Sequence, residues 1–163
     1  MYKAAVITVS DRGAAGLRED KSGPRVAEIL ENAGYDVVLR EMIPDQQPVI
    51  EKTLIHCVDE GGIHLVVTTG GTGFSLRDVT PEATLAVSER MVPGIAEAMR
   101  LESLKKTPRA MLSRGQAGLR KTSLILNLPG SPRGAEENLR AVLPTLGHGL
   151  DILLDSAKGC GEN

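Results

Sequence analysis

One stretch of the chain, residues 65–82, reads LVVTTGGTGFSLRDVTPE and limits strongly what the chain can fold into. Its first residues are apolar and β-branched, which is typical of a strand buried on both faces. Three glycines follow within four residues, and glycine lets the backbone turn sharply and approach a ligand closely. Thr80 and Pro81 predict a helix, with Thr80 as N-cap and Pro81 at the first helical position. A glycine loop beside a helix N-terminus favours an anionic ligand, because free amides and the helix dipole attract negative charge.

The rest of the chain predicts strands alternating with helices. Strands are expected to begin at residues 4, 35, 65 and 123, and helices to cover residues 24–32, 47–60, 80–87, 95–105 and 134–154. We expect the last helix to be interrupted near Pro144 or Gly147. Residues 110–114 and 116–120 are expected to form a small irregular strand pair. The order predicts an α/β fold of three layers, with a mostly parallel sheet, helices on both faces and a short antiparallel addition.

Length, charge and cysteine content exclude several classes of protein. The 163 residues are expected to form a single domain, residues 1–163, and a net charge of −2 gives no field that would recruit nucleic acid. No apolar run approaches the roughly 20 residues that span a membrane, and a signal-peptide pattern is missing, so we expect a cytoplasmic protein. Cys57, Cys160 and the three histidines follow no metal-binding or redox spacing, which favours reduced thiols.

The predicted strand ends carry the candidate binding groups. In open α/β sheets, ligands bind beyond the carboxyl ends of the strands. The four ends here are polar or rich in glycine, and they fall at residues 10–12, 44–45, 69–73 and 128–132. All four are therefore expected to converge on one edge of the sheet.

Two carboxylates, Asp45 and Asp78, are predicted at this edge. Carboxylates would repel phosphates unless they hold a metal ion or water, which is how enzymes of phosphoryl transfer use them. There are structural alternatives to this functional interpretation. Asp45 could be an ordinary turn residue, Asp78 could only brace its loop, and the glycines could form a purely structural turn. Five basic residues could neutralise phosphate: Arg77, Arg114, Arg120, Lys121 and Arg133. Arg77 is the strongest candidate because it lies between the glycines and the predicted helix.

Several motifs occur together in a fixed order along the chain. They read VSDR, DKSGP, IPD, TTGGTG, RDVTPEAT, SR and NLPGSP, and they begin at residues 9, 20, 43, 68, 77, 113 and 127. In this order they resemble the molybdenum cofactor biosynthesis proteins of the MogA/MoaB type, which are related to the G domain of gephyrin. The resemblance covers nearly the whole chain, from the first strand to the last helix.

The resemblance implies a molybdopterin-binding fold and an adenylyltransferase. The reaction transfers AMP from ATP to the terminal phosphate of molybdopterin and releases pyrophosphate, before molybdenum or tungsten is inserted. ATP and molybdopterin are then substrates, Mg²⁺ is expected, and a protein that inserts molybdate is a possible partner. A homotrimer is expected, with hexamers in some members. The alternative is a non-catalytic molybdopterin-binding or scaffolding paralogue; an unrelated phosphate-binding domain would require the whole motif order to be coincidence.

The resemblance also assigns residues. It places the catalytic carboxylates at Asp45 and Asp78, which would also organise Mg²⁺, and the site serine at Ser113. Gln46 stands where relatives often carry an acid, so a second carboxylate is missing at that point. The expected substrate-binding residues are Ser10, Asp11, Thr69, Gly70, Gly71, Thr72, Gly73, Ser113, Pro129, Gly130 and Ser131.

Overall fold

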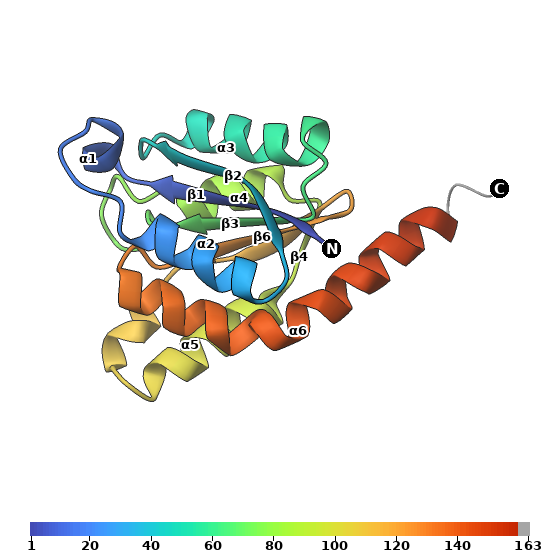
Figure 1. The fold of residues 1–163 in the computed structure, drawn as a ribbon. Coiled ribbons are helices and arrows are strands. Elements are labelled where there is room, and N and C mark those ends of the chain that lie inside the picture. The colour runs from blue at the N-terminus through green and yellow to red at the C-terminus, as the bar shows by residue number, and fades with distance from the viewer. Residues whose placement is uncertain (160–163) are drawn as a thin grey trace.

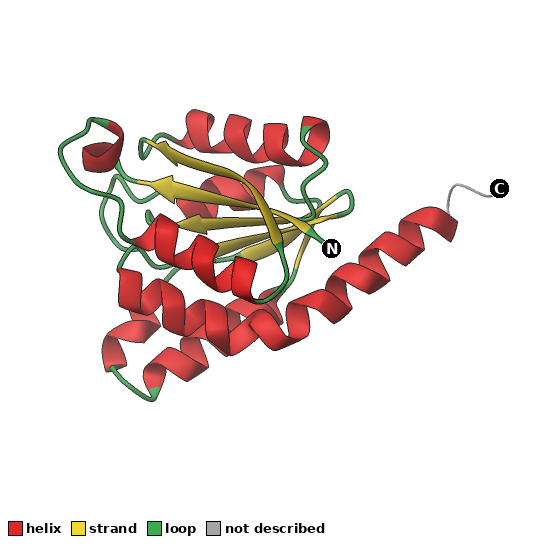
Figure 2. Cartoon of the chain, viewed as in Figure 1, coloured by secondary structure: helices red, strands yellow, loops and turns green. Residues whose placement is uncertain are grey.

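The computed structural model describes residues 1–159 (Figures 1 and 2). The strands are β1 (Lys3–Val9), β2 (Asp36–Ile43), β3 (Leu65–Thr69), β4 (Arg90–Met91), β5 (Ala117–Arg120) and β6 (Ser123–Leu128). The helices are α1 (Asp11–Ala14), α2 (Ser22–Asn32), α3 (Gln47–Ile55), α4 (Thr80–Val87), α5 (Pro93–Leu104) and α6 (Pro132–Gly159). A π-helical turn, His56–Glu60, extends α3, and a 3₁₀ turn, Pro108–Leu112, follows α5.

The strands form one mixed sheet in the order β2-β1-β3-β6-β5-β4. β1, β2, β3 and β6 run parallel, whereas β5 is antiparallel to β6 and β4 is antiparallel to β5. β3 lies in the middle of the parallel part, and all of its residues are buried. The mostly parallel sheet with a short antiparallel addition is therefore confirmed.

Helices cover both faces of the sheet, α3 and α4 on one side and α2, α5 and α6 on the other (Figure 1). Alternate residues of each parallel strand point to opposite faces, as a strand period of two requires. Val66 of β3 therefore packs with α3 and α4, whereas its neighbours Leu65 and Val67 pack with α2, α5 and α6. Burying each such side chain contributes about 1.5–3 kcal/mol, so these two cores hold the three layers together.

The antiparallel addition differs from the prediction in its partners. Residues 110–114 were expected to pair with 116–120, but the chain forms the 3₁₀ turn Pro108–Leu112 instead. β5 pairs with β6 on one side and with β4 on the other. β4 is only two residues long, too short to produce a recognisable strand pattern.

The predicted break in the last helix is wrong, because α6 continues through Pro144. A proline inside a helix removes one backbone hydrogen bond and crowds the preceding turn. Leu139 and Val142 before it, and Leu146 and Leu150 after it, are nonetheless all buried against the same core. Burial on both sides of Pro144 outweighs the lost hydrogen bond. Within residues 1–159, no helix is both long enough and apolar enough to cross a membrane.

Candidate active site

A cavity of about 610 Å³ opens at the carboxyl ends of the four parallel strands. Ser10 lies after β1, Asp45 after β2, Gly70 and Gly71 after β3, and Gly130 after β6, and all of them line it. Figure 2 shows the arrowheads of β1, β2 and β3 pointing to this edge, where loops gather. The expected convergence of the four strand ends is confirmed.

The glycine loop after β3 depends on glycine at two positions. Gly70 and Gly71 have φ angles of +106° and +67°, which other residues rarely adopt. A Cβ on Gly70 would meet the backbone of Val9, and a Cβ on Gly71 would meet the Thr80 hydroxyl and lie 3.0 Å from Asp45 Oδ1. The loop therefore passes so close to its neighbours that side chains are excluded.

Hydrogen bonds fix this loop and decide which of its amides can bind a ligand. The Gly70 amide donates to the Leu128 carbonyl at 3.1 Å, so it is not available to an anion. Thr69 Oγ1 donates to the Pro129 carbonyl at 2.7 Å, which joins the ends of β3 and β6. In the described part of the chain, the amides of Gly71 and Gly73 donate to no group. Of these two, Gly71 lines the cavity, so its amide remains for anionic oxygen there, whereas Gly73 is not among the lining residues.

Asp11 and Asp45 exchange hydrogen bonds across the ends of β1 and β2. The Asp11 amide donates to Asp45 Oδ2 at 2.8 Å, and the Asp45 amide donates to Asp11 Oδ1 at 2.9 Å. Arg77 donates to both oxygens of Asp11, at 2.9 and 3.0 Å. These bonds lower the pKa of Asp11 below its ordinary value. Arg77 is therefore committed to a carboxylate, which argues against its predicted role as the first phosphate ligand.

Burial raises the pKa of Asp45 above its ordinary value. The negative charges of Asp11 and Asp78 raise it further, while the amide of Asp11 acts in the opposite direction. Asp78 is held in place because its Oδ2 accepts from the Ser75 amide at 3.0 Å. Asp45 and Asp78 thus line the same cavity, close enough for the charge of Asp78 to raise the pKa of Asp45.

This donor set fits a single Mg²⁺ ion. Mg²⁺ is usually held by one or two carboxylates, with water and substrate phosphates completing its coordination. Asp45 and Asp78 supply two carboxylates at the cavity wall. No group of three or more His, Cys, Asp or Glu side chains among residues 1–159 could hold a metal alone. A cation here would depend on the phosphates of a substrate.

The family described as "probable molybdopterin binding domain" matches residues 5–148. The chain belongs to this family. It is 51% identical over 144 residues to the molybdopterin adenylyltransferase of Haemophilus influenzae, covering 87% of this chain and 73% of the relative. It is 46% identical over 151 residues to the molybdopterin adenylyltransferase of Helicobacter pylori, covering 91% and 86%.

A solved structure agrees with the fold. The molybdopterin biosynthesis enzyme MoaB of Thermus thermophilus superposes with a TM-score of 0.90 at 49% identity, covering 94% of this chain and 96% of that one. The expected molybdopterin-binding fold is confirmed.

Ser10 and Ser131 line the cavity of this protein in similar positions, each at the start of a helix. Ser10 Oγ accepts from the Gly13 amide at 3.0 Å, and Ser131 Oγ accepts from the Gly134 amide at 3.1 Å. Each hydroxyl caps the start of a helix and keeps its own hydrogen for a ligand. Both residues line the cavity, as expected of substrate-binding residues.

The structure does not bring Ser113 into this cavity. Ser113 lines a separate hollow of about 390 Å³, together with Glu82 and Arg114. Arg114 forms an ion pair with Glu82 and donates to the carbonyls of Gly73 and Asp78, both at 2.8 Å. Its amide also donates to the Thr72 carbonyl at 2.9 Å. Arg114 therefore braces the glycine loop from outside the cavity, rather than neutralising phosphate within it.

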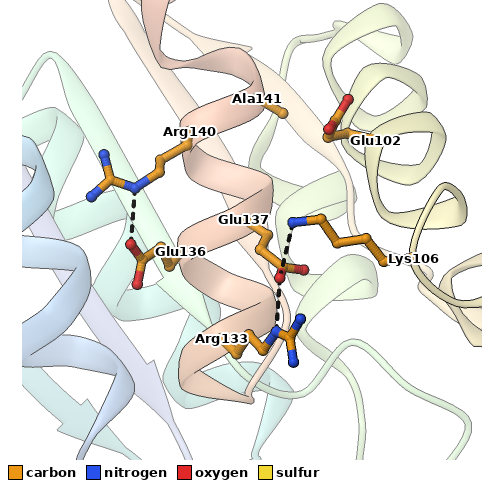
Figure 3. Close-up of a pocket in the computed structure, with 7 residues that line it drawn as sticks. All are labelled: Glu102, Lys106, Arg133, Glu136, Glu137, Arg140 and Ala141. Carbon is orange, nitrogen blue, oxygen red and sulfur yellow. Dashed lines mark hydrogen bonds and ion pairs between the residues drawn. The ribbon is translucent and has the colours of Figure 1, made fainter.

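The other predicted basic residues also lie elsewhere. Arg120 and Lys121 both pair with Asp59. Arg133 lines a hollow of about 480 Å³ between α5 and α6, where it pairs with Glu137 (Figure 3). Two further pairs in this hollow are Lys106 with Glu137 and Arg140 with Glu136. This hollow is a network of matched charges that joins two helices.

The Cys57 thiol takes no part in the site. Cys57 is buried in the core beside α3, and burial raises its pKa to about 11, so it stays protonated and unreactive. Cys160 lies outside the described residues.

Residues before α2 were missed as candidates, although they line the cavity. Arg18 and Lys21 bring positive charge, and Asp20 accepts from the Thr8 hydroxyl at 2.7 Å and from the Gly23 amide at 2.9 Å. The DKSGP motif was noted in the sequence but was given no role. Its place soon after the first predicted strand was the signal that it returns to the same edge of the sheet.

Thr80 is not the N-cap that the sequence predicted. α4 begins at Thr80 itself, the cap position belongs to Val79, and no side chain caps the helix. The Thr80 amide instead donates to the Gly71 carbonyl at 3.1 Å, which ties the helix to the glycine loop. A backbone bond, rather than a side-chain cap, therefore sets the start of α4.

Proposed function

We propose that this protein is a molybdopterin adenylyltransferase, which transfers AMP from ATP to the terminal phosphate of molybdopterin and releases pyrophosphate. Two relatives that carry this name are 51% and 46% identical to the chain. The observation that carries the proposal is the meeting of Asp45, Asp78 and the glycine loop in one cavity. A pair of carboxylates beside free amides suits a reaction between two phosphates, because such a reaction needs alignment and charge neutralisation more than a protein nucleophile.

In the proposed reaction, an oxygen of the terminal phosphate of molybdopterin attacks the α-phosphorus of ATP. The bond from that phosphorus to the oxygen bridging the α- and β-phosphates breaks, and pyrophosphate leaves with its electron pair. Asp45 and Asp78 would hold Mg²⁺, which when bound neutralises phosphate charge. The amide of Gly71 would hold anionic oxygen, and Lys21 and Arg18 would attract the triphosphate. A similar role for the Gly73 amide is proposed on the family resemblance alone.

The substrate contacts follow the strand ends. Ser10, Thr69, Gly130 and Ser131 line the cavity and are proposed to contact substrate. Asp11 is proposed to act by holding Asp45, and Pro129 by accepting from Thr69. Thr72 is buried, so its side chain is proposed to support the loop. Ser113 is proposed as a contact on the family resemblance alone.

We also propose that residues 1–163 act as one cytoplasmic domain that assembles as a homotrimer or hexamer and passes its product to a molybdate-inserting protein. Exposed apolar side chains on α5 and on the 3₁₀ turn beside it support an assembly, since such surfaces often mark interfaces. They are Leu101, Leu104, Met111 and Leu112. Light scattering of the purified protein should give three or six times the chain mass, and a monomer at all concentrations would refute the assembly.

The function is tested by incubating the protein with molybdopterin, ATP and Mg²⁺ and measuring pyrophosphate. An adenylyltransferase releases pyrophosphate only when molybdopterin is present. A non-catalytic paralogue would bind molybdopterin and release none. The same incubation without molybdopterin controls for hydrolysis of ATP.

A further inference from the structure

Thr80 carries a hydroxyl with no hydrogen-bond partner. Among the buried side-chain nitrogens and oxygens of residues 1–155, Thr80 Oγ1 is the one atom left unpaired, and the residue is 0% exposed. One turn later in α4, Thr84 is equally buried, but its hydroxyl accepts from Asn127 Nδ2 at 2.8 Å. A buried hydroxyl without a partner is unfavourable, and most native proteins avoid it. The exception therefore calls for a reason.

The unpaired hydroxyl lies beside an unpaired carboxylate oxygen. Thr80 Oγ1 and Asp45 Oδ1 both flank the point that a Cβ on Gly71 would occupy. Asp45 Oδ2 accepts from the Asp11 amide, whereas Oδ1 accepts from no group in the described chain. A donor without an acceptor and an acceptor without a donor thus lie on the same side of one glycine.

A structural role does not account for this hydroxyl. It does not cap α4, and it makes no hydrogen bond to any residue that the structure describes. Valine has nearly the same shape and would fill the same space without an unpaired polar atom. Natural proteins leave such a destabilising group in place mainly at functional sites, where the group serves the activity.

The charged groups around Asp45 leave it without a cation of its own. Asp11 and Asp78 are both negative, and Arg77 is held by Asp11 through two hydrogen bonds. The Thr80 hydroxyl is a neutral donor on the side of Asp45 Oδ1, as the Asp11 amide is on the side of Oδ2. Hydrogen bonds of active sites often form fully only when substrate is bound.

We propose that Thr80 is a positioning residue for Asp45: in the substrate-bound protein, its hydroxyl donates a hydrogen bond to Asp45 Oδ1 and holds that carboxylate toward the reacting phosphates. This inference rests on the function proposed above. Thr80 itself touches no reacting atom. It acts by fixing the direction of Asp45.

Two valine substitutions in the same helix test this role. Thr80→Val should keep or raise the Tm of the unliganded protein, by up to about 4 °C, because it removes an unpaired hydroxyl. It should lower kcat for pyrophosphate release about 10- to 100-fold and raise KM modestly, because part of the lost hydrogen bond stabilises the substrate-bound protein. Thr80→Ser keeps the hydroxyl and should retain most of the activity. Thr84→Val, the matched control, should lower Tm and leave kcat unchanged, because it deprives Asn127 of an acceptor.

A double substitution shows whether Thr80 acts through Asp45. When Asp45→Asn is already present, Thr80→Val should reduce kcat no further, because the two changes remove the same interaction. Losses that multiply in the double variant would overturn the proposal, as would a Thr80→Val protein with lower Tm and full kcat.

A second readout keeps the inference separate from the proposed function. Binding of molybdopterin and ATP should raise Tm less in Thr80→Val than in the wild type, because the new hydrogen bond forms only with the hydroxyl. If the wild type released no pyrophosphate, the proposed function would fail. The difference in the Tm rise between wild type and Thr80→Val would still test the role of Thr80. An equal rise in Tm in both proteins would overturn it.

Discussion

Gly71 shows at the scale of a single residue how closely the cavity wall is packed. Its φ of +67° and its contacts with the Thr80 hydroxyl and Asp45 both exclude a side chain. Gly34 offers a comparison, because its φ is +87° while a Cβ there would meet nothing within 4 Å. Comparing the two glycines distinguishes two effects of adding a side chain: strain in the backbone, which both positions would suffer, and crowding, which only Gly71 would suffer.

We therefore predict different outcomes for two glycine-to-alanine changes. Gly34→Ala should lower the free energy of unfolding by about 1–2 kcal/mol and leave activity intact, because only the backbone is strained. Gly71→Ala should cost more stability and abolish most activity, because its Cβ also displaces Thr80 and Asp45. Chemical denaturation and pyrophosphate release measure the two effects. Equal losses of stability in both variants would show that crowding at Gly71 is unimportant.

Asp78 is the residue whose replacement should affect the reaction most directly. Asp78→Asn should lower pyrophosphate release at least about 100-fold, because one of two carboxylates at the phosphates is lost. Asp36→Asn is the control, since Asp36 is exposed at the start of β2, at the opposite edge of the sheet. Wild-type turnover in Asp78→Asn would remove Asp78 from the catalytic groups.

At the scale of elements, Arg114 supports the glycine loop from outside the cavity, together with Glu82, which lies on α4. Arg114 donates to two carbonyls of the loop that carries Asp78 and also holds Glu82, whose pKa its hydrogen bond lowers. The ion pair is partly exposed, so its own contribution to stability is small. Its larger effect is on the position of the loop.

We predict that Arg114→Met reduces activity more than stability. The free energy of unfolding should fall by about 1–2 kcal/mol, while kcat/KM for pyrophosphate release falls at least about tenfold, because the loop loses its support. Arg25→Met is the matched control, since Arg25 pairs with Glu28 and Glu136 and does not line the cavity. It should lose similar stability and keep its activity. Proportionate losses in both variants would refute a special role for Arg114.

The sequence predicted the elements that bear the site better than the contacts between them. Apolar β-branched runs and glycine breaks predicted the four parallel strands, and topology then placed Asp45 and Gly71 at one edge. The exchange between Asp11 and Asp45, and the pairing of Arg77 with Asp11, depend on distances between strand ends that no local pattern encodes. The unpaired hydroxyl of Thr80 was equally hidden, because the sequence predicted a helix cap there.

At the scale of the whole molecule, exposed ion pairs link helices and loops around the sheet. Arg25 of α2 and Arg140 hold Glu136 of α6, while Arg120 and Lys121 hold Asp59. Hydrogen bonds from these partners lower the pKa of Glu136 and that of Asp59 to about 2. Because both pKa values are lower in the folded chain, these groups stabilise it at neutral pH.

We predict that this stabilisation is lost in acid. It is present above the ordinary pKa values of 4.5 and 3.8, and it disappears as pH falls through about 2. Tm should therefore decrease between about pH 4.5 and pH 2, and Glu136→Gln should make the decrease shallower. Asp45 has a raised pKa and offsets part of the loss, since its protonated form is favoured in the fold. An unchanged slope in Glu136→Gln would contradict this assignment.

The central claim is that AMP is transferred to molybdopterin in the cavity that Asp45 and Asp78 line. It is tested most directly by supplying ATP labelled at the α-phosphate with molybdopterin and Mg²⁺. We predict that the label appears on molybdopterin, one equivalent for each pyrophosphate released, and that Asp78→Asn prevents its transfer. Label that stays in ATP, or that appears only as free AMP, would contradict the claim.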